Sequence, residues 1–91
     1  MALLVSVFQT GGYDAWKQMF DSDPAGRKQA ATGHRIMRSV DDPDEVFVRV
    51  EFDSVDAAKA FREQLMGSGA LNNVTVVKEP TVVEVADEAT Y

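Results

Sequence analysis

Residues 2–9 (ALLVSVFQ) restrict the fold more than any other part of the chain, because they predict a strand that is apolar on both faces. Aliphatic side chains occupy one face, and Leu4, Ser6 and Phe8 occupy the other. Strands buried on both sides have this pattern, whereas strands with one solvated side alternate between apolar and polar residues. We therefore expect this strand to lie inside a sheet that is covered on both sides.

The next segment predicts an interrupted helix. After a glycine pair, aromatic side chains at helical spacing predict a helix over residues 13–20. Asp23 and Pro24 have the pattern of a helix N-cap followed by a first-turn proline, so a second short helical segment is expected to run to about Ala31. The helical region is therefore expected to be broken near residues 22–24.

Residues 34–40 and 46–52 predict a β-hairpin joined by an acidic, proline-containing loop. A turn centred near Pro43 would place Arg35 opposite Glu51, which is a favourable cross-strand charge pair. The acidic loop lacks the ligand spacing of a calcium-binding loop, so we expect a solvated turn there.

The last third of the chain predicts one helix and two strand segments. The helix is expected over residues 55–66, capped by Asp53 or Ser54. Residues 73–79 predict the fourth strand, and residues 81–85 alternate enough to predict a short extra strand that reaches the sheet edge of a partner subunit.

The order strand–helix–strand–strand–helix–strand predicts one α+β domain over residues 1–86, with a ferredoxin-like antiparallel sheet and helices on one face. Residues 87–91 are expected to form a frayed tail. Met37 and Phe47 add apolar surface to the face without helices, and such exposed patches are typical of interfaces. We expect a sheet-to-sheet homodimer, with a monomer that has a partly apolar open face as the alternative.

Composition restricts the partners and cofactors. A net charge of -6, with nine scattered Lys and Arg, disfavours nucleic-acid binding. We expect no membrane span, because no apolar run reaches the required length. One histidine and no cysteine disfavour a metal centre. The sequence also has no glycine-rich motif of the kind that binds nucleotides. We therefore expect no cofactor. The absence of cysteine also fits a cytoplasmic location.

Several residue runs in the first two thirds of the chain have a specific pattern. They are Tyr13-Asp14-Ala15-Trp16-Lys17, Phe20-Asp21, Arg27, Arg38-Ser39-Val40-Asp41-Asp42-Pro43, Val46, Glu51-Phe52-Asp53 and Ala57-Ala58-Lys59-Ala60-Phe61. The pattern resembles a group within the dimeric α+β barrel superfamily, which includes antibiotic-biosynthesis monooxygenases and polyketide cyclases. The resemblance implies a dimer and a pocket between each sheet and its helices, where a small, often aromatic, molecule binds.

Two residues of the predicted hairpin are candidates for catalysis. His34 and Arg38 share one face of their strand, and if that face meets the helices they would line the pocket with Tyr13, Trp16 and Phe20. A histidine beside aromatic rings acts as a general base or hydrogen-bond donor near neutral pH. An arginine there would hold a carboxylate or enolate oxygen.

Each candidate also has a structural interpretation. His34 would be solvated if it starts an edge strand, and Trp16 would be an ordinary core residue. Arg27, a further candidate for the pocket lining, would either close the pocket or bond a helix end.

Two classes of function therefore stay open. The first is an enzyme without a metal, either a cofactor-independent monooxygenase or a cyclase/isomerase, acting on a small aromatic or polyketide-like molecule. The second is a non-catalytic dimer with a ligand-binding or structural role, such as a stress or accessory protein. The sequence does not decide whether the protein is an enzyme.

Overall fold

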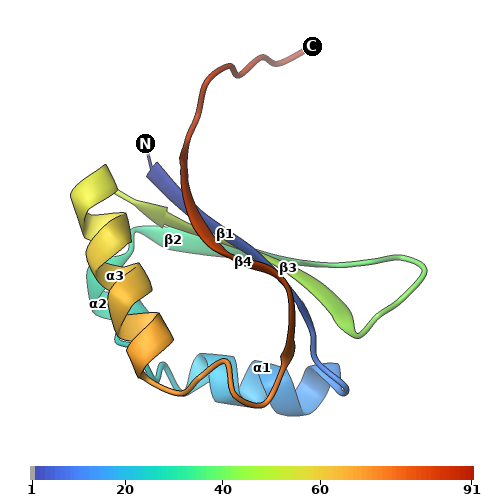
Figure 1. Cartoon of the computed structure of the whole chain (residues 1–91). Helices are drawn as coiled ribbons and strands as arrows, with labels where there is room; N and C mark the ends of the chain where they lie inside the picture. The colour runs from blue at the N-terminus through green and yellow to red at the C-terminus, as the bar shows by residue number, and fades with distance from the viewer. Residues whose placement is uncertain (1) are drawn as a thin grey trace.

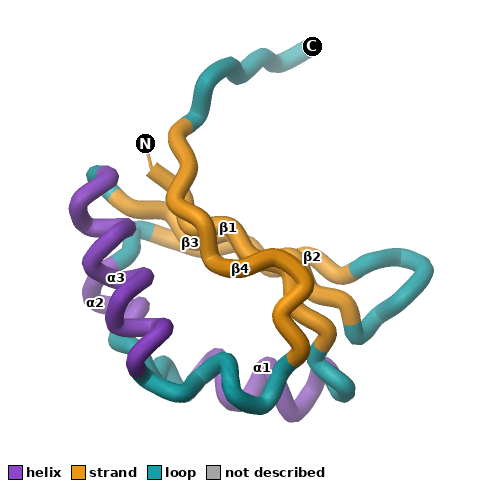
Figure 2. Tube along the Cα trace, viewed as in Figure 1, coloured by secondary structure: helices purple, strands orange, loops and turns teal. Residues whose placement is uncertain are grey.

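The computed structural model describes residues 2–91, in which four strands and three helices form one α+β domain (Figure 1). In chain order these are β1 (Ala2–Gln9), α1 (Tyr13–Asp21), α2 (Arg27–Ala30), β2 (Gly33–Arg38), β3 (Glu45–Phe52), α3 (Val55–Gly67) and β4 (Thr75–Glu84). The strands form one antiparallel sheet in the order β2-β3-β1-β4. The helices all lie on the same side of that sheet (Figure 2). The predicted fold class and element order are confirmed.

Strand β1 lies inside the sheet, as its two apolar faces predict, between β3 and β4. Leu4 and Phe8 are buried on the helix side, and Leu3 is buried on the opposite side. Each large apolar side chain that folding buries contributes about 1.5–3 kcal/mol. The helix-side core consists of Ala2, Leu4, Phe8, Trp16, Val46, Val48, Val50, Phe52, Ala58 and Phe61.

The predicted break between two helical segments is present, but its geometry differs from the expectation. Asp23 and Gly26 both adopt left-handed backbone conformations, with φ angles of 61° and 75°. Gly26, and not Asp23, is the N-cap of α2, because the turn closed by the Gly26 N–H on the Asp23 carbonyl delays the start of the helix. Asp23 instead accepts a hydrogen bond from the backbone N–H of Lys28 at 3.2 Å.

Helix α3 begins as its sequence predicts. The side chain of Ser54 accepts a hydrogen bond from the backbone N–H of Ala57 at 3.1 Å, so Ser54 is the N-cap. The helix buries Ala58 and Phe61 against the sheet.

The β2–β3 pairing differs from the predicted register by two residues. Arg35 lies opposite Arg49 and not, as predicted, opposite Glu51. The cause is the connecting loop, in which the Ser39 N–H donates to the Glu45 carbonyl oxygen, so that the hairpin is centred on Asp42 rather than on Pro43. A shift of two residues keeps every side chain on its predicted face, but it replaces a favourable charge pair with a like-charge pair.

Strand β4 is one continuous strand and not two. Its second half pairs with β1 of the same chain, with Val82 opposite Leu4, so the prediction of a separate extra strand is wrong, and a contact of this segment with a partner subunit stays a prediction. The β1–β4 register shifts around Ser6, and the buried Pro80 lies in this irregular stretch. Proline has no N–H to donate, and an edge strand with a bulge tolerates it.

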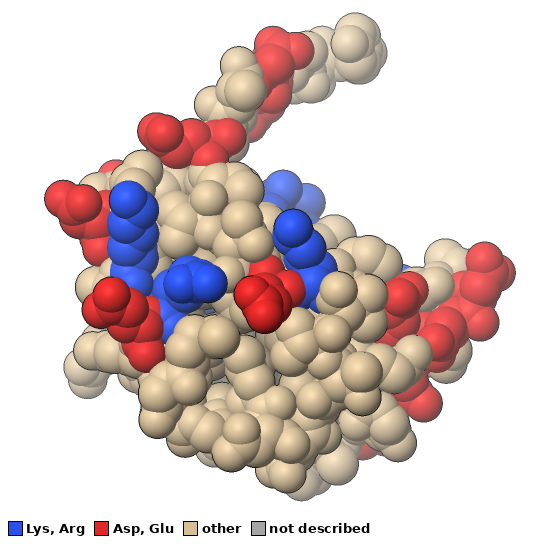
Figure 3. Space-filling model, viewed as in Figure 1, with Lys and Arg blue, Asp and Glu red and all other residues tan. Residues whose placement is uncertain are grey.

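Residues 85–91 form neither helix nor strand and extend away from the sheet (Figure 1). Figure 3 shows acidic side chains gathered along this C-terminal segment and at the tip of the β2–β3 hairpin. Over residues 2–91, no helix is long and apolar enough to cross a membrane.

Candidate functional site

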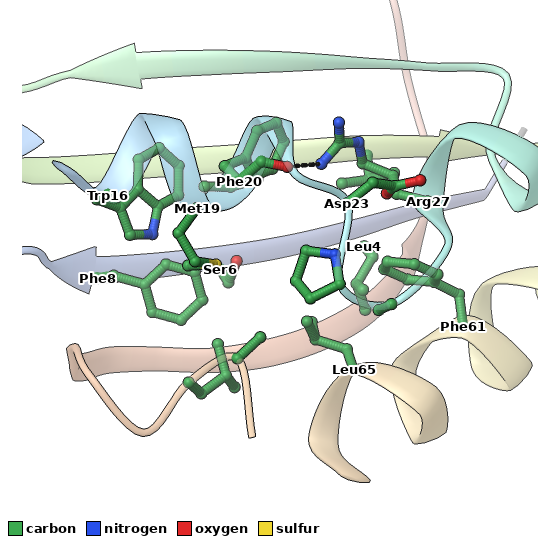
Figure 4. Close-up of a pocket in the computed structure, with 16 residues that line it drawn as sticks. Leu4, Ser6, Phe8, Trp16, Met19, Phe20, Asp23, Arg27, Phe61 and Leu65 are labelled. Carbon is green, nitrogen blue, oxygen red and sulfur yellow. Dashed lines mark hydrogen bonds between the residues drawn. The ribbon is translucent and has the colours of Figure 1, made fainter. Parts of the chain in front are cut away.

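A cavity of about 60 Å³ lies between the helix side of the sheet and the helices (Figure 4). Leu4, Ser6 and Phe8 of β1 form part of its floor, together with residues of β3. Helix α1 and the α1–α2 connection form one wall, and α3 with residues 70–71 forms the other. Apart from a few polar groups the lining is apolar, which is typical of sites for small organic molecules.

Aromatic side chains form a continuous row along α1. The Trp16 and Phe20 rings are stacked, with centroids 5.2 Å apart, and the Tyr13 centroid lies 6.0 Å from that of Trp16. Such ring pairs contribute about 0.5–1.5 kcal/mol beyond the area that they bury. Trp16 and Phe20 line the cavity, so the row gives it a rigid aromatic wall.

Arg27 lies at the end of this row. The sequence left two roles open for it, bonding a helix end or closing the pocket, and the structure shows contacts relevant to both. Its guanidinium carbon lies 3.7 Å from the centroid of the Phe20 ring, and its Nη1 donates a hydrogen bond to the Phe20 carbonyl oxygen at 3.1 Å. The residue is 5% exposed and also lines the cavity. It therefore bonds a helix end and forms part of the cavity wall at the same time.

The guanidinium supplies positive charge to an apolar space. Burial lowers the pKa of Arg27, and the negative charge of Asp23 partly opposes that effect. Arginine stays protonated in proteins because its ordinary pKa is so high. The Arg27 side chain, whose guanidinium contacts Phe20, therefore carries a fixed positive charge next to the cavity.

Asp23 is a cavity residue that sequence reasoning missed. The sequence predicts Asp23 as a helix cap, and its side chain does accept a hydrogen bond from the first turn of α2, but the residue also lies in the cavity lining. Among residues 2–91, its buried Oδ1 has no hydrogen-bond partner. Nothing in the local sequence distinguishes an aspartate that faces a cavity from one that caps a helix.

His34 does not line the cavity. It is exposed at the start of edge strand β2, and its ring meets the edge of Phe20 with centroids 5.1 Å apart. Its pKa is lowered, first by partial burial and then by the positive charges of Arg27 and Lys17. The imidazole is therefore neutral near pH 7, and Phe20 separates it from the cavity.

Arg38 and Tyr13 also lie outside the cavity lining. The Arg38 guanidinium covers the Tyr13 ring at 3.9 Å, and its Nε donates to the Pro43 carbonyl oxygen at 2.8 Å. The expectation that Arg38 and His34 would line the pocket is thus corrected, because the α1 aromatics fill the space between β2 and the cavity. Any catalytic role of these two residues stays a prediction.

Within residues 2–91, no three His, Cys, Asp or Glu residues are close enough together to hold a metal ion. The polar residues of the cavity lining are Ser6, Asp23 and Arg27.

Comparison with solved structures identifies full-length relatives of the fold. One is a protein from Deinococcus radiodurans, provisionally described as an antibiotic biosynthesis monooxygenase, with a TM-score of 0.73 and 13% sequence identity over 100% of this chain and 98% of that one. Another is Rv0793 from Mycobacterium tuberculosis, with a TM-score of 0.63 and 15% identity over 98% of both chains. No family model matches the sequence, and neither does any curated protein. At these identities the matches show that the chain has the fold of this structural group, as the resemblance of its residue runs implied.

Proposed function

We propose that the protein is a cofactor-independent monooxygenase for a small aromatic molecule, which it binds in the cavity between sheet and helices. The observation that carries the proposal is an apolar, aromatic-walled cavity with one buried arginine in its lining. The fold shared with the Deinococcus radiodurans protein supports the same class of function, by analogy.

The chemistry needs an electron-rich substrate and a site that favours its anion. Arg27 is the residue that would stabilise a phenolate or enolate, because a cation in an apolar site interacts strongly with developing negative charge. This assigns to Arg27 the role that sequence reasoning gives to Arg38. In the overall reaction a phenol gives four electrons to O₂, one oxygen atom enters the product quinone, and the other leaves as water.

The size of the cavity limits the ligand. Its volume of about 60 Å³ is less than the roughly 150 Å³ of an engineered cavity that holds benzene. Even a single aromatic ring therefore requires a wall to move. Met19 is the best candidate, because it lies between the cavity and a neighbouring hollow of about 240 Å³ that also shares Trp16. Methionine side chains adapt readily to a changed neighbour.

We also propose that the protein is a homodimer through the helix-free face of the sheet. Met37 and Phe47 lie opposite each other on that face and are 41% and 38% exposed. Arg35 and Arg49 are paired there as like charges; Arg49 Nη2 lies 3.9 Å from Glu51 Oε1 of the same chain, and its buried Nε has no hydrogen-bond partner among residues 2–91. A second copy would cover the apolar pair and supply carboxylates to the arginines.

The alternative function is ligand binding without turnover. The position of His34 supports this alternative. His34 is exposed and, among the described residues, does not line the cavity, so it cannot act there as a general base. One experiment separates the two functions. The protein is incubated in air with a panel of single-ring phenols, while ligand binding is followed by thermal shift and O₂ consumption by an electrode.

Binding with O₂ uptake, and incorporation of ¹⁸O from ¹⁸O₂ into the product, is the expected result. Binding without uptake would establish the alternative. A panel that gives neither binding nor uptake would overturn the proposed site.

A further inference from the structure

We infer that the Ser6 hydroxyl binds an acceptor oxygen of the ligand, with the indole N–H of Trp16 as a second donor in the same cavity. The inference rests on the proposed function, because it assumes that the cavity binds a small aromatic molecule. It adds two specificity-determining residues and a chemical class to that proposal, namely aromatic molecules with a carbonyl or phenolate oxygen.

The first observation is that Ser6 is the polar exception on an apolar strand face. Its neighbours on the helix side of β1 are Leu4 and Phe8, and all three line the cavity. Ser6 is 6% exposed, so it is as buried as the core residues around it. A hydroxyl in such a place without a hydrogen bond lowers stability, because it gives up its bonds to water. Packing alone therefore does not explain a serine at this position.

The second observation is that the hydroxyl has no partner in the fold and yet is not closed off. Within residues 2–91 the Ser6 side chain makes no hydrogen bond, even though the pairing of β1 with β4 is irregular beside it. In the same part of the chain, the unpaired polar atoms that are fully closed off from water are the Oδ1 of Asp23 and the Nε of Arg49. The Ser6 oxygen is not one of them, so it keeps open surface, and the space that Ser6 lines is the cavity.

The third observation is that Trp16 has the same two properties. It is also 6% exposed, and among the described residues its indole N–H has no hydrogen-bond partner and is not closed off from water. A buried indole N–H usually has a partner. Stacking on Phe20 fixes the ring. Trp16 lines both the cavity and the neighbouring hollow, which are the spaces that a ring would use once Met19 moves.

The two donors lie in the same part of the site. Figure 4 shows Ser6 and Trp16 at the end of the cavity that Met19 and Phe8 also line. One ligand oxygen, or two oxygens on one small ring, can therefore meet both groups.

Together the two groups select an acceptor. An indole N–H can only donate, and a hydroxyl can donate as well as accept. A carbonyl oxygen has two lone pairs and accepts from both groups, whereas an ammonium group has no lone pair to offer. A phenolate oxygen accepts the same bonds more strongly, because hydrogen bonds to charged groups are the stronger ones. The lining therefore favours aromatic ketones, aldehydes and phenolates over aromatic ammonium ions.

The test compares 4-fluoroacetophenone with 4-fluoro-α-methylstyrene, in which a CH₂ group replaces the carbonyl oxygen and the shape is kept. Both affinities are measured by ¹⁹F NMR titration. In Ser6→Ala we expect the affinity for the ketone to fall about 2- to 10-fold, as the loss of one neutral hydrogen bond predicts, and the affinity for the alkene to stay unchanged. The urea midpoint of the ligand-free variant should not fall below that of the wild type, because the Ser6 hydroxyl has no bond within the described chain to lose.

Ser39→Ala is the matched control. The Ser39 hydroxyl accepts hydrogen bonds from the backbone N–H groups of Asp41 and Asp42, and Ser39 is not among the described residues that line the cavity. This variant should lower the urea midpoint and leave both affinities unchanged.

The wild-type indole N–H signal tests the second donor. Ring currents from the two probes are alike because their shapes are alike, so a difference between them reports a hydrogen bond. We expect the ketone to move the Trp16 N–H proton signal further downfield than the alkene does.

The possible outcomes separate the inference from the proposed function. Equal changes in the two affinities in Ser6→Ala, or no change, would overturn the role of Ser6, and a lower midpoint of the ligand-free variant would show that its role is structural. Equal indole shifts with the two probes would overturn the role of Trp16. Each of these results would leave the cavity proposal intact. If the wild type binds phenols but neither probe, the inference is wrong, and if it binds no phenol either, the proposed site is wrong as well.

Discussion

The guanidinium carbon of Arg27 lies 3.7 Å from the centroid of the Phe20 ring, and the same side chain donates a hydrogen bond to the Phe20 carbonyl oxygen. One residue therefore satisfies the C-terminal end of α1, covers an aromatic ring and lines the cavity. Helices end with carbonyl groups that have no partner within the helix, and cationic side chains stabilise them. The wall of the cavity and the break between α1 and α2 thus depend on the same contact.

Replacing Arg27 with methionine tests this contact. Arg27→Met keeps most of the apolar volume but removes the charge and the donor to Phe20. We expect the free energy of unfolding to fall by about 1–3 kcal/mol, measured by urea denaturation. The control is Lys28→Met on the neighbouring, exposed residue, for which the change should stay within about 0.5 kcal/mol. Equal losses in the two variants would show that the contact has no special role.

The pH dependence of stability tests the environment of His34. Its folded-state pKa lies below the ordinary value of 6.5, so the unfolded state takes up a proton first as the pH falls. The stability associated with neutral His34 is fully present above pH 6.5 and is lost as the pH falls through the folded-state pKa. We expect the stability of the wild type relative to His34→Gln to decline below pH 6.5, by a small amount because His34 is exposed. Parallel curves for the two proteins between pH 7 and pH 5 would contradict the lowered pKa.

Shortening Met19 tests its proposed role as the wall that must move for a ring to fit the cavity. Met19→Ala should join the cavity to the neighbouring hollow and admit a second ring. We expect the affinity for 2-naphthol to rise roughly tenfold, because burying roughly another 50 Å² of apolar surface contributes about 1.3 kcal/mol. Calorimetry would measure the affinity. Met66→Ala, at an exposed position on α3, is the control and should leave it unchanged. An unchanged affinity in Met19→Ala would show that Met19 is not the wall that limits the cavity.

Light scattering tests the proposed dimer. The wild type should have twice the 10.0 kDa mass of one chain at micromolar concentration. Phe47→Lys places a charge on the helix-free face and should shift the protein to the monomer, because burying an unpaired charge in an apolar interface is unfavourable. Val40→Lys, at a position that is 99% exposed, should remain dimeric. A wild-type mass equal to that of one chain would contradict the proposed dimer.

The sequence predicts most of the fold because the deciding patterns are local. The two apolar faces of residues 2–9 require a strand inside the sheet, and Ser54 before an apolar stripe predicts the start of α3. The β2–β3 register was wrong because backbone hydrogen bonds in the loop, and not the charges of Arg35 and Glu51, set the position of the turn.

The site was harder to predict, because parity along a strand gives the face of a residue but not its neighbours. His34 and Arg38 do lie on the helix side of β2, yet α1 aromatic side chains separate them from the cavity. Asp23 was missed for a different reason. Its left-handed backbone and its unpaired oxygen result from tertiary contacts around the helix break, and no local pattern indicates them.

Chemical-shift mapping by ¹H–¹⁵N NMR with 4-fluorophenol tests the central claim, that the cavity binds an aromatic ligand, most directly. Trp16 is the only tryptophan in the sequence, so its indole N–H gives one unambiguous signal from the cavity wall. We predict that this signal shifts on titration, together with the amides of Asp23 and Leu65, which line the cavity from other segments. Shifts confined to the β2 edge around His34, or to the helix-free face around Phe47, with an unchanged Trp16 signal, would contradict the account.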